Sequence, residues 1–471
     1  MRLERHDPNV FLFETPCNKY FYDVNTNTIN SIGEDLYYYL KNGTKTEKAI
    51  ADFSRYKKLG YLSSKRPQEI RHSLDSSLEE RLNHEVEQIT LQITQQCNFR
   101  CAYCVYTPKD FMTQRSHSEL TMDTSVALEA IKFYAKHSIN CRKKCIGFYG
   151  GEPLLNFDLI EKVVKFAEKQ FFGNDILFTV TTNGSLLTKE IALFLQEHNF
   201  NLMISLDGAE EVHNRSRKFA VNGKGTFGVI YENIKMLQHD FPDLYKRTGF
   251  NVVVDPRYSC VDMHNFFTND SVFQEVAVQS TLIDDFFSIE KVIPSDQFRE
   301  ESYINQVKAY IAQISTDSQI KTSRITKFGL EADIEKTTQH LHRQKELPDI
   351  AAPSGPCIPG QRRLFVDIKG DLFPCERVSE FSAVMNIGSI YDGFNFKRAH
   401  DILNIGSLTA DECKECWAFR HCTICARLCD NNGKLSKELK RSNCQEVRER
   451  VAESFKEYIM LKEMSNIRIC E

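Results

Sequence analysis

Apolar residues follow two kinds of spacing between about residue 86 and residue 300. Short runs rich in β-branched residues, typical of strands, alternate with longer segments in which apolar residues recur every three or four positions, as in amphipathic helices. This alternation predicts an α/β domain. The clearest helical segments are 158–171 and 189–198. The predicted strands, in chain order, are ITLQIT, CIGFYGG, ILFTVTTNG, NLMISLDG, FNVVVDP and TLIDDFF.

The flanking regions have other patterns. Before residue 85, VFLFET and KYFYDVNTNTINSI predict short strands joined at an Asn-rich turn, and EDLYYYLKNG and TEKAIADFSRYKKLGYL predict two helices, the second capped by Thr44 or Thr46. After residue 297, SYINQVKAYIAQI predicts one helix, followed by a polar segment rich in Lys, Thr and Gln. A Pro- and Gly-containing stretch at 353–356 precedes a cysteine-rich end. We expect four parts: 1–85, 86–300, 301–352 and 353–471.

Charge and composition narrow the functional classes. The 471 residues include 60 basic and 64 acidic side chains, a net charge of -4, so no overall field favours nucleic acid or an anionic membrane. The start, MRLERHDPNV, lacks the apolar segment of a secretory signal, and no run of about 18 apolar residues occurs. We therefore expect a cytoplasmic protein. In that reducing compartment, clusters among the 16 cysteines favour metal binding over disulfides.

The first cysteine cluster is Cys97-x3-Cys101-x2-Cys104, directly after the first predicted strand of the α/β domain. Three thiolates in one loop suit a four-iron cubane with one open iron, whereas structural zinc usually takes four ligands. An aromatic residue, Tyr103, precedes the last cysteine. This loop resembles that of the radical S-adenosylmethionine (SAM) enzymes. The alternative is a zinc knuckle.

The residues at the ends of the following strands agree with that resemblance. Polar groups and glycines at the carboxyl ends of successive strands are what a partial barrel offers to a bound cofactor. The resemblance implies a partial (β/α)6 TIM-like barrel, with Ser205 and Arg217 binding the SAM carboxylate. The predicted cofactor-binding residues are Tyr103, Gly150, Gly151, Glu152, Thr182, Asn183, Ser205, Asp207 and Arg217.

Eight further cysteines occupy the C-terminal third, enough to ligate two more four-iron clusters. Gly370-x4-Cys375 and Cys413-x2-Cys416-x5-Cys422 resemble the SPASM extension of radical SAM enzymes. The resemblance implies an outer cluster and an inner cluster, and zinc binding is the alternative. CTICARLC departs from the SPASM spacing, so either one or both of its last two cysteines bind the inner cluster. The predicted outer ligands are Cys413, Cys416, Cys422 and Cys444, and the inner ones are Cys357, Cys375, Cys425 and Cys429.

The N-terminal segment is similar to the winged-helix module called the RiPP recognition element. That resemblance implies binding of a leader peptide as an added strand. A winged helix that binds DNA is the alternative, and the basic segment 55–72 would assist it. We favour a peptide because the basic residues fall mostly after the module.

Together these parts resemble sactipeptide and ranthipeptide maturases. The resemblance implies an oxidoreductase that uses SAM and three 4Fe-4S clusters to generate a 5′-deoxyadenosyl radical, with Cys97, Cys101 and Cys104 as the catalytic loop. It would join a cysteine sulfur to a carbon of another residue in a ribosomal precursor peptide, with flavodoxin or ferredoxin as electron donor and with no nucleic acid or membrane partner. The alternatives are a carbon–carbon crosslink, formylglycine formation, or a zinc-binding adaptor without catalysis. Five cysteines receive no role: Cys17, Cys141, Cys145, Cys260 and Cys470.

Overall fold

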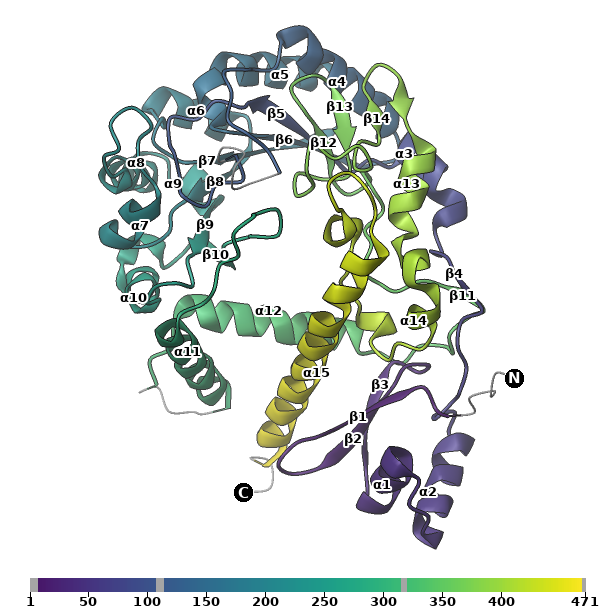
Figure 1. Ribbon diagram of the computed structural model, residues 1–471. Coiled ribbons are helices and arrows are strands. Elements are labelled where there is room, and N and C mark those ends of the chain that lie inside the picture. The colour runs from purple at the N-terminus through teal and green to yellow at the C-terminus, as the bar shows by residue number, and fades with distance from the viewer. Residues whose placement is uncertain (1–6, 107–113, 315–319, 468–471) are drawn as a thin grey trace.

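The computed structural model describes residues 7–106, 114–314 and 320–467 (Figure 1). Its central element is a sheet whose first six strands in the chain from residue 88 onward are parallel and lie side by side in sequence order. This confirms the predicted parallel α/β arrangement. The six strands are β5 (Gln88–Thr94), β6 (Lys143–Gly150), β7 (Asp175–Thr182), β8 (Phe200–Ser205), β9 (Thr248–Val254) and β10 (Ala277–Leu282).

Helices connect these strands and cover the outer side of the sheet (Figure 1). Because the strands are parallel, their carboxyl ends share one edge of the sheet, where the predicted site residues lie. The two helices predicted from periodicity are confirmed as α5 and α6. The connecting helices are α4 (Thr124–His137), α5 (Phe157–Gln170), α6 (Lys189–Glu197), α7 (Glu210–Ser216), α8 (Phe227–Asp240), α9 (Pro242–Lys246) and α10 (Val261–Asn269).

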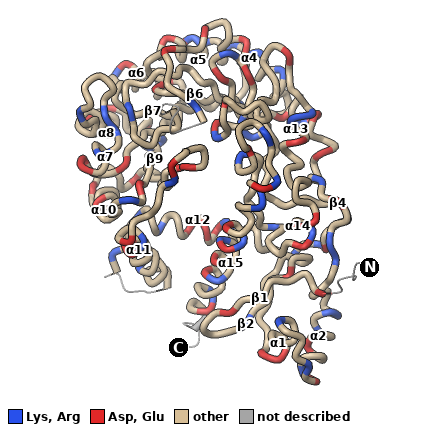
Figure 2. The backbone as a smooth tube through the Cα atoms, viewed as in Figure 1, with Lys and Arg blue, Asp and Glu red and all other residues tan. Residues whose placement is uncertain are grey.

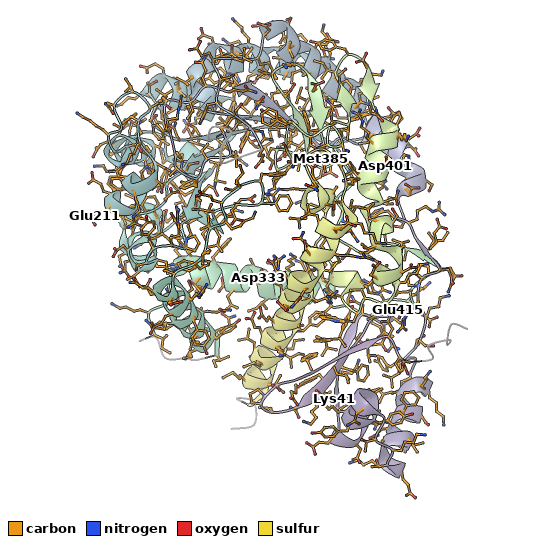
Figure 3. All side chains as sticks on the ribbon, in the orientation of Figure 1. Lys41, Glu211, Asp333, Met385, Asp401 and Glu415 are labelled. Carbon is orange, nitrogen blue, oxygen red and sulfur yellow. The ribbon has the colours of Figure 1, made fainter. Side chains whose placement is uncertain are left out.

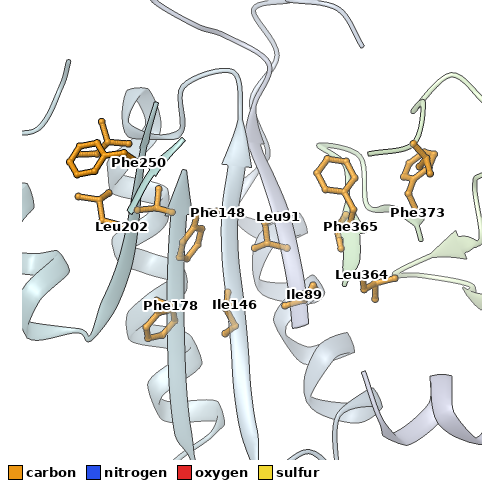
Figure 4. Packing of buried hydrophobic residues seen from close by; sticks show 14 of the residues in the cluster. Ile89, Leu91, Ile146, Phe148, Phe178, Leu202, Phe250, Leu364, Phe365 and Phe373 are labelled. Atoms are coloured by element: carbon orange, nitrogen blue, oxygen red, sulfur yellow. The ribbon is translucent and has the colours of Figure 1, made fainter. Parts of the chain in front are cut away.

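The core lies between the sheet and these helices. Parallel strands are buried on both faces, and here large aromatic residues stack across neighbouring strands (Figure 4). The ring centroids of Phe148 on β6 and Phe178 on β7 lie 6.3 Å apart, and those of Phe178 and Phe200 on β8 lie 5.2 Å apart. Ile89, Leu91 and Ile146 are also buried. This packing holds the strand ends, and thus the site, in fixed positions.

The last predicted strand was misplaced. TLIDDFF was expected to form a strand from Thr281, but β10 begins at Ala277 and ends at Leu282. The two aspartates that follow accept backbone N–H groups within their own loop: Asp284 Oδ1 from Phe286 (3.2 Å) and Asp285 Oδ2 from Val292 (2.8 Å). Such Asx interactions compete with strand pairing, so the strand stops before them.

The C-terminal region extends the same sheet, which the sequence did not predict. β12 (Leu364–Val366) pairs parallel to β5, and three short antiparallel strands complete ten strands. This pairing brings the cysteine-rich region beside the first barrel strand. The remaining elements of this region include β13 (Asp371–Phe373), β14 (Gly388–Ser389), β15 (Gly393–Phe394), α13 (Phe396–Leu403), α14 (Ala410–Lys414), η5 (Phe419–His421), η6 (Ala426–Cys429) and α15 (Lys437–Ile467).

The N-terminal strands and helices are confirmed. The antiparallel sheet has the order β1-β2-β3, and two helices pack on it around Phe21, Leu36 and Leu62. Thr46, rather than Thr44, caps the second helix, because its hydroxyl accepts the N–H of Ala49 at 3.0 Å. The elements are β1 (Val10–Glu14), β2 (Lys19–Asp23), β3 (Thr28–Ile32), α1 (Glu34–Asn42) and α2 (Glu47–Lys58).

The connecting segments contain more structure than expected. The predicted helix after residue 297 is confirmed as α11 (Asp296–Ile314), but the polar segment behind it also forms a helix, α12 (Arg324–His340), whose start is capped by the Ser323 hydroxyl. Between the N-terminal module and the barrel lie β4 (Glu69–Ile70), which pairs with β11 (Ile350–Ala351), and α3 (Leu78–His84). The four domain boundaries stay predictions.

Acidic and basic residues are interspersed over the fold (Figure 2), in keeping with the small net charge. Among the helices of the described residues, none is long and apolar enough to cross a membrane.

Candidate active site

A pocket of about 430 Å³ lies at the carboxyl ends of the barrel strands. Ten of the predicted residues line it, drawn from the cysteine loop, β6, β7, β8 and the segment after α7. Glu152 and Asp207 are not among the lining residues. The ten are Cys97, Cys101, Tyr103, Cys104, Gly150, Gly151, Thr182, Asn183, Ser205 and Arg217.

Two glycines let the end of β6 lie directly against the cysteine loop. The N–H of Gly151 donates to Thr94 O at 2.8 Å, and that of Glu152 donates to Gln96 O at 2.8 Å. A Cβ at Gly151 would lie 2.0 Å from Gln96 O, and one at Gly150, where φ is 143°, would lie 2.3 Å from Thr94 O. Only glycine fits at these positions. The pair therefore positions the loop as well as forming part of the pocket wall.

Glu152 is fully buried and supports residues of the pocket wall without lining the pocket itself. Its carboxylate accepts the Thr182 hydroxyl at 2.7 Å, the N–H of Asn183 at 2.7 Å and the N–H of Leu154 at 3.0 Å. Burial raises the pKa of Glu152 to about 7, against the effect of these hydrogen bonds. The carboxylate fastens the end of β7 to the end of β6. A direct contact with a cofactor stays a prediction.

Asp207 likewise supports a residue of the pocket wall, Arg217, by hydrogen bonds. It accepts two hydrogen bonds from Arg217, from Nε at 2.8 Å and Nη2 at 3.1 Å, and one from the N–H of Val253 at 3.0 Å. The Tyr103 hydroxyl donates to the same carboxylate. Arg217 also directs Nη1 toward Cys101 Sγ, 4.0 Å away. This network fixes an aromatic ring and a cation beside the cysteine loop.

The three loop thiols fit an iron–sulfur cluster. They line one pocket together, and three thiolates leave one iron of a four-iron cubane open for a ligand. Burial raises the pKa of Cys97 to about 12 and also raises the pKa values of Cys101 and Cys104. Metal binding must therefore displace protons from these thiols. Within the described residues, no three His, Cys, Asp or Glu side chains converge as the ligands of a single metal ion.

The outer cysteines also meet in space. Residues from α14, η5 and its flanks, and α15 surround a small cavity of about 40 Å³. Lys440 is buried beside it and donates to Cys413 Sγ at 3.3 Å. The four cysteines that line this cavity are those assigned to the outer cluster: Cys413, Cys416, Cys422 and Cys444.

The inner cysteines are less closely grouped. Cys357 is exposed, and its segment is tied to that of Cys375 by a hydrogen bond from Gly360 N to Pro374 O at 3.3 Å. Cys429 is fully buried and donates to Cys425 O at 3.5 Å. Burial raises the pKa of Cys429 to about 12, and the neighbouring thiols of Cys425, Cys444 and Cys422 raise it as well. Which of Cys425 and Cys429 ligates stays a prediction.

Other residues of the site have no local sequence signal. Arg115 is fully buried, with Nε 3.4 Å from Glu380 Oε2 and its guanidinium 4.7 Å from the Phe365 ring. Gln92, on β5, donates to Glu380 at 3.0 Å. These contacts join segments that lie at least 250 positions apart in the chain, which a local pattern does not encode. Further residues of the pocket wall that were not predicted include Tyr106, Gln114, Tyr149, Asn251, Gln279, Arg363, Glu376 and Arg377.

The cysteines without a predicted role lie apart from this pocket or outside the described residues. Cys141 and Cys145 are both half-buried. Cys145 lies inside β6, and the Cys141 thiol donates to Val86 O at 3.2 Å. Cys17 is exposed, Cys260 is buried, and Cys470 lies outside the described residues.

Comparisons with known proteins bear on the barrel. A family model described as the Radical SAM superfamily matches residues 91–259. The cysteine-type anaerobic sulfatase-maturating enzyme of Clostridium novyi (strain NT) is 35% identical over 145 residues, covering 30% of this chain and 37% of that enzyme. The radical SAM cyclopropyl synthase TigE of Paramaledivibacter caminithermalis is 26% identical over 198 residues, covering 40% of this chain and 38% of the synthase. The chain therefore matches well under half the length of each relative.

A likeness of fold extends further. The structure of native anSMEcpe with bound AdoMet superimposes with a TM-score of 0.57 at 20% identity, covering 81% of this chain and 98% of the other. At that identity the likeness concerns the fold alone. Residues 91–259 are identified as a radical SAM domain by the family model, and the match to the C. novyi enzyme shows homology of part of this chain to anaerobic sulfatase-maturating enzymes.

Proposed function

We propose that this protein is a radical SAM enzyme that forms thioether crosslinks in a cysteine-containing precursor peptide. The observation that carries the proposal is the composition of the pocket wall. The cysteine loop forms one part of it, and Glu376 and Arg377, which directly follow Cys375, form another. A substrate in this pocket would therefore lie between the core site and the inner cysteines.

The pocket residues fit the two cofactors that this activity needs. Cys97, Cys101 and Cys104 would hold the cluster, while Gly150, Gly151, Thr182, Asn183, Ser205 and Arg217 would surround SAM. When bound, these groups supply a carbon-centred radical by reductive cleavage of SAM. The chain contributes position: Glu152 holds Thr182 and Asn183, and Asp207 holds Arg217. The enclosing wall limits the access of water to a reactive species.

Thioether formation sets a chemical requirement that the inner cysteines would meet. One C–H and one S–H bond are replaced by one C–S bond, so a hydrogen atom, a proton and an electron leave the substrate. The hydrogen atom would be taken by the carbon-centred radical that SAM supplies, the proton would pass to water, and the electron would need an acceptor. A cluster bound by Cys375 and its neighbours would be an acceptor close to the pocket, because Glu376 lies in the pocket wall.

The N-terminal sheet offers a place for a leader peptide. Among the described residues, β3 pairs only with β2, so its other edge is open to an added strand. The Tyr56 hydroxyl on α2 donates to Ser31 O at 2.8 Å, which places α2 beside this edge. A leader would lie along β3 next to α2, as a RiPP recognition element binds it.

A second candidate follows from the relatives. The C. novyi relative is a cysteine-type anaerobic sulfatase-maturating enzyme, and TigE is a cyclopropyl synthase. Formylglycine formation and carbon–carbon bond formation therefore fit the barrel about as well as thioether formation. The pocket residues do not separate these products.

Mass spectrometry separates them. The enzyme is coexpressed anaerobically with a candidate cysteine-containing precursor peptide, and the peptide is then treated with an alkylating agent. A thioether lacks two hydrogens, keeps its sulfur and leaves that cysteine unalkylated. A carbon–carbon crosslink also lacks two hydrogens but leaves the cysteine alkylated, and formylglycine formation removes the sulfur. Either of these outcomes would replace the thioether proposal. An unmodified peptide, with zinc and no iron in the protein, would favour the adaptor.

A further inference from the structure

The turn between β2 and β3 is buried against the outer cysteine site. This turn, residues 24–27, belongs to the N-terminal module, yet all four of its residues are at most 6% exposed. Its neighbours are residues 417–421, which join Cys416 to Cys422. The contact therefore connects the edge strand β3, which begins one residue after the turn, with the segment that carries two predicted outer ligands.

Arg420 provides the main contact. Its Nε donates to Val24 O at 2.7 Å, and its Nη2 donates to Asn25 O at 3.1 Å and Lys345 O at 2.8 Å. The remaining nitrogen, Nη1, donates to the Gln344 side chain. One guanidinium thus binds the backbone of the turn and of the segment after α12. Lysine has no planar set of donors that reproduces this pattern.

The side chains of the turn complete the contact. Asn27 Oδ1 accepts the Tyr22 hydroxyl at 2.8 Å and His421 Nε2 at 3.0 Å, and Asn27 Nδ2 donates to His340 O at 2.6 Å. Asn27 has a φ of 56°, in the left-handed region that asparagine tolerates. Its position is therefore fixed by both its backbone and its side chain.

Two contacts around this turn widen the interface. The rings of Phe11 and Trp417 stack with centroids 3.8 Å apart and an interplanar angle of 11°. Arg66 Nε donates to Glu415 Oε2 at 3.2 Å, and Figure 3 labels Glu415 near the N-terminal sheet. Glu415, directly before Cys416, and residues between Cys416 and Cys422 are thus held by the module or by its linker.

We propose that Arg420 and His421 are positioning residues through which a metal centre at the outer cysteine site holds β3 in place. The inference rests on the proposed metal site but not on the identity of the metal or of the product. Ligation of Cys416 and Cys422 fixes both ends of the segment 417–421, and that segment fixes the turn that begins β3. Linkage makes the effect reciprocal: if the bound metal stabilises docking of the N-terminal module, docking of the module strengthens metal binding by the same factor.

Hydrogen exchange of the full-length protein tests this directly. The reconstituted wild type is compared with the double variant Cys416→Ser/Cys422→Ser, with Arg420→Ala and with Arg420→Lys. We expect amides in residues 19–32 to exchange about tenfold faster in the double variant and in Arg420→Ala, because local opening costs less free energy. Arg420→Lys should fall between, since it keeps the charge and loses the multiple donors. Arg450→Ala, an exposed arginine on α15, should exchange as the wild type does.

The reciprocal measurement is metal retention. Arg420→Ala should lose outer-site metal to a chelator more readily than Arg450→Ala. Unchanged exchange in residues 19–32 after removal of the outer metal would overturn the inference. If Arg420→Ala does not accumulate, the Lys variant and the double cysteine variant decide. If the enzyme modifies no peptide but shows the expected change in hydrogen exchange, the proposed function is refuted and the inference stands. If it modifies a peptide but exchange in residues 19–32 is unchanged, the inference is refuted and the proposed function stands.

Discussion

Several residues around the pocket act by holding other residues. Asp207 and Glu152 place carboxyl groups in the interior, and each accepts hydrogen bonds from neighbouring segments of the site. His213 belongs to the same group. Its Nδ1 accepts the N–H of Asp207 at 3.3 Å, and its Nε2 donates to the Thr226 hydroxyl at 2.9 Å, which in turn donates to Arg217 O at 3.1 Å. The hydrogen bonds select one neutral tautomer of the imidazole.

Changing Glu152 to Gln tests whether its carboxylate holds the strand ends. In the Gln variant, an amide NH2 group would replace one carboxylate oxygen of Glu152 and would face an N–H donor, so one hydrogen bond would be lost. We expect Glu152→Gln to lower the free energy of unfolding by about 2 kcal/mol and to weaken SAM binding. Urea unfolding and equilibrium dialysis measure these effects. Glu197→Gln, an exposed change at the end of α6, is the control, and equal behaviour of the two variants would contradict the assigned role.

The buried histidine predicts a pH dependence. Burial, together with the positive charge of Arg217, lowers the pKa of His213 to about 3. In the unfolded chain the pKa of a histidine is about 6.5. Below that pH the unfolded chain therefore binds a proton at His213 that the folded chain does not bind. Stability from this residue is therefore complete above the unfolded pKa and is lost as the pH falls.

The variant His213→Gln should remove that dependence. Between about pH 6 and pH 4, we expect the free energy of unfolding of the variant to fall less steeply than that of the wild type, by about 1.4 kcal/mol per pH unit. Urea unfolding at a series of pH values measures the two slopes. Parallel curves would show that His213 is protonated in the folded protein.

At the scale of elements, the ends and edges of strands carry the function. The carboxyl ends of β5 to β8 position the pocket, and the open edge of β3 is the proposed leader site. β12 continues the barrel sheet beside β5 and so brings the C-terminal region to the pocket.

Strand addition on β3 can be tested on the peptide instead of the enzyme. In an added strand, alternate residues direct their N–H groups to the edge. Two leader peptides are compared, one N-methylated on odd-numbered residues of the bound segment and one on even-numbered residues. We expect only one set to lose binding, as measured by calorimetry. Equal binding by both, or equal loss, would contradict strand addition.

The sequence predicted the parts of the site that are local. The three cysteines lie within eight positions, and the polar residues that follow each strand could be located because strand ends share an edge. The pairing of β12 with β5, the Arg115–Glu380 contact and the burial of turn 24–27 against Arg420 were not predictable. Each joins segments hundreds of positions apart, and backbone acceptors such as Val24 O have no sequence signature.

At the scale of the whole molecule, the N-terminal module packs against the rest of the protein and shares its hydrophobic core. Phe13 and Tyr22 belong to the same buried cluster as the barrel core, and both contact Phe455 on α15, with centroids 6.4 and 4.8 Å apart. Deleting residues 1–80 would expose this surface and disturb the outer cysteine site. Changes confined to the open edge of β3 or to the leader are therefore sharper tests of peptide binding than truncation.

The central claim is that Cys97, Cys101 and Cys104 form the radical-generating site. The direct measurement is 5′-deoxyadenosine formed from SAM, under anaerobic reducing conditions, by the reconstituted wild type and by the variant with all three changed to Ala. We predict that the wild type contains about twelve iron atoms and cleaves SAM, and that the variant keeps about eight and forms no 5′-deoxyadenosine. Formation of 5′-deoxyadenosine at the wild-type rate by the variant, or stoichiometric zinc in place of iron in the wild type, would contradict the claim.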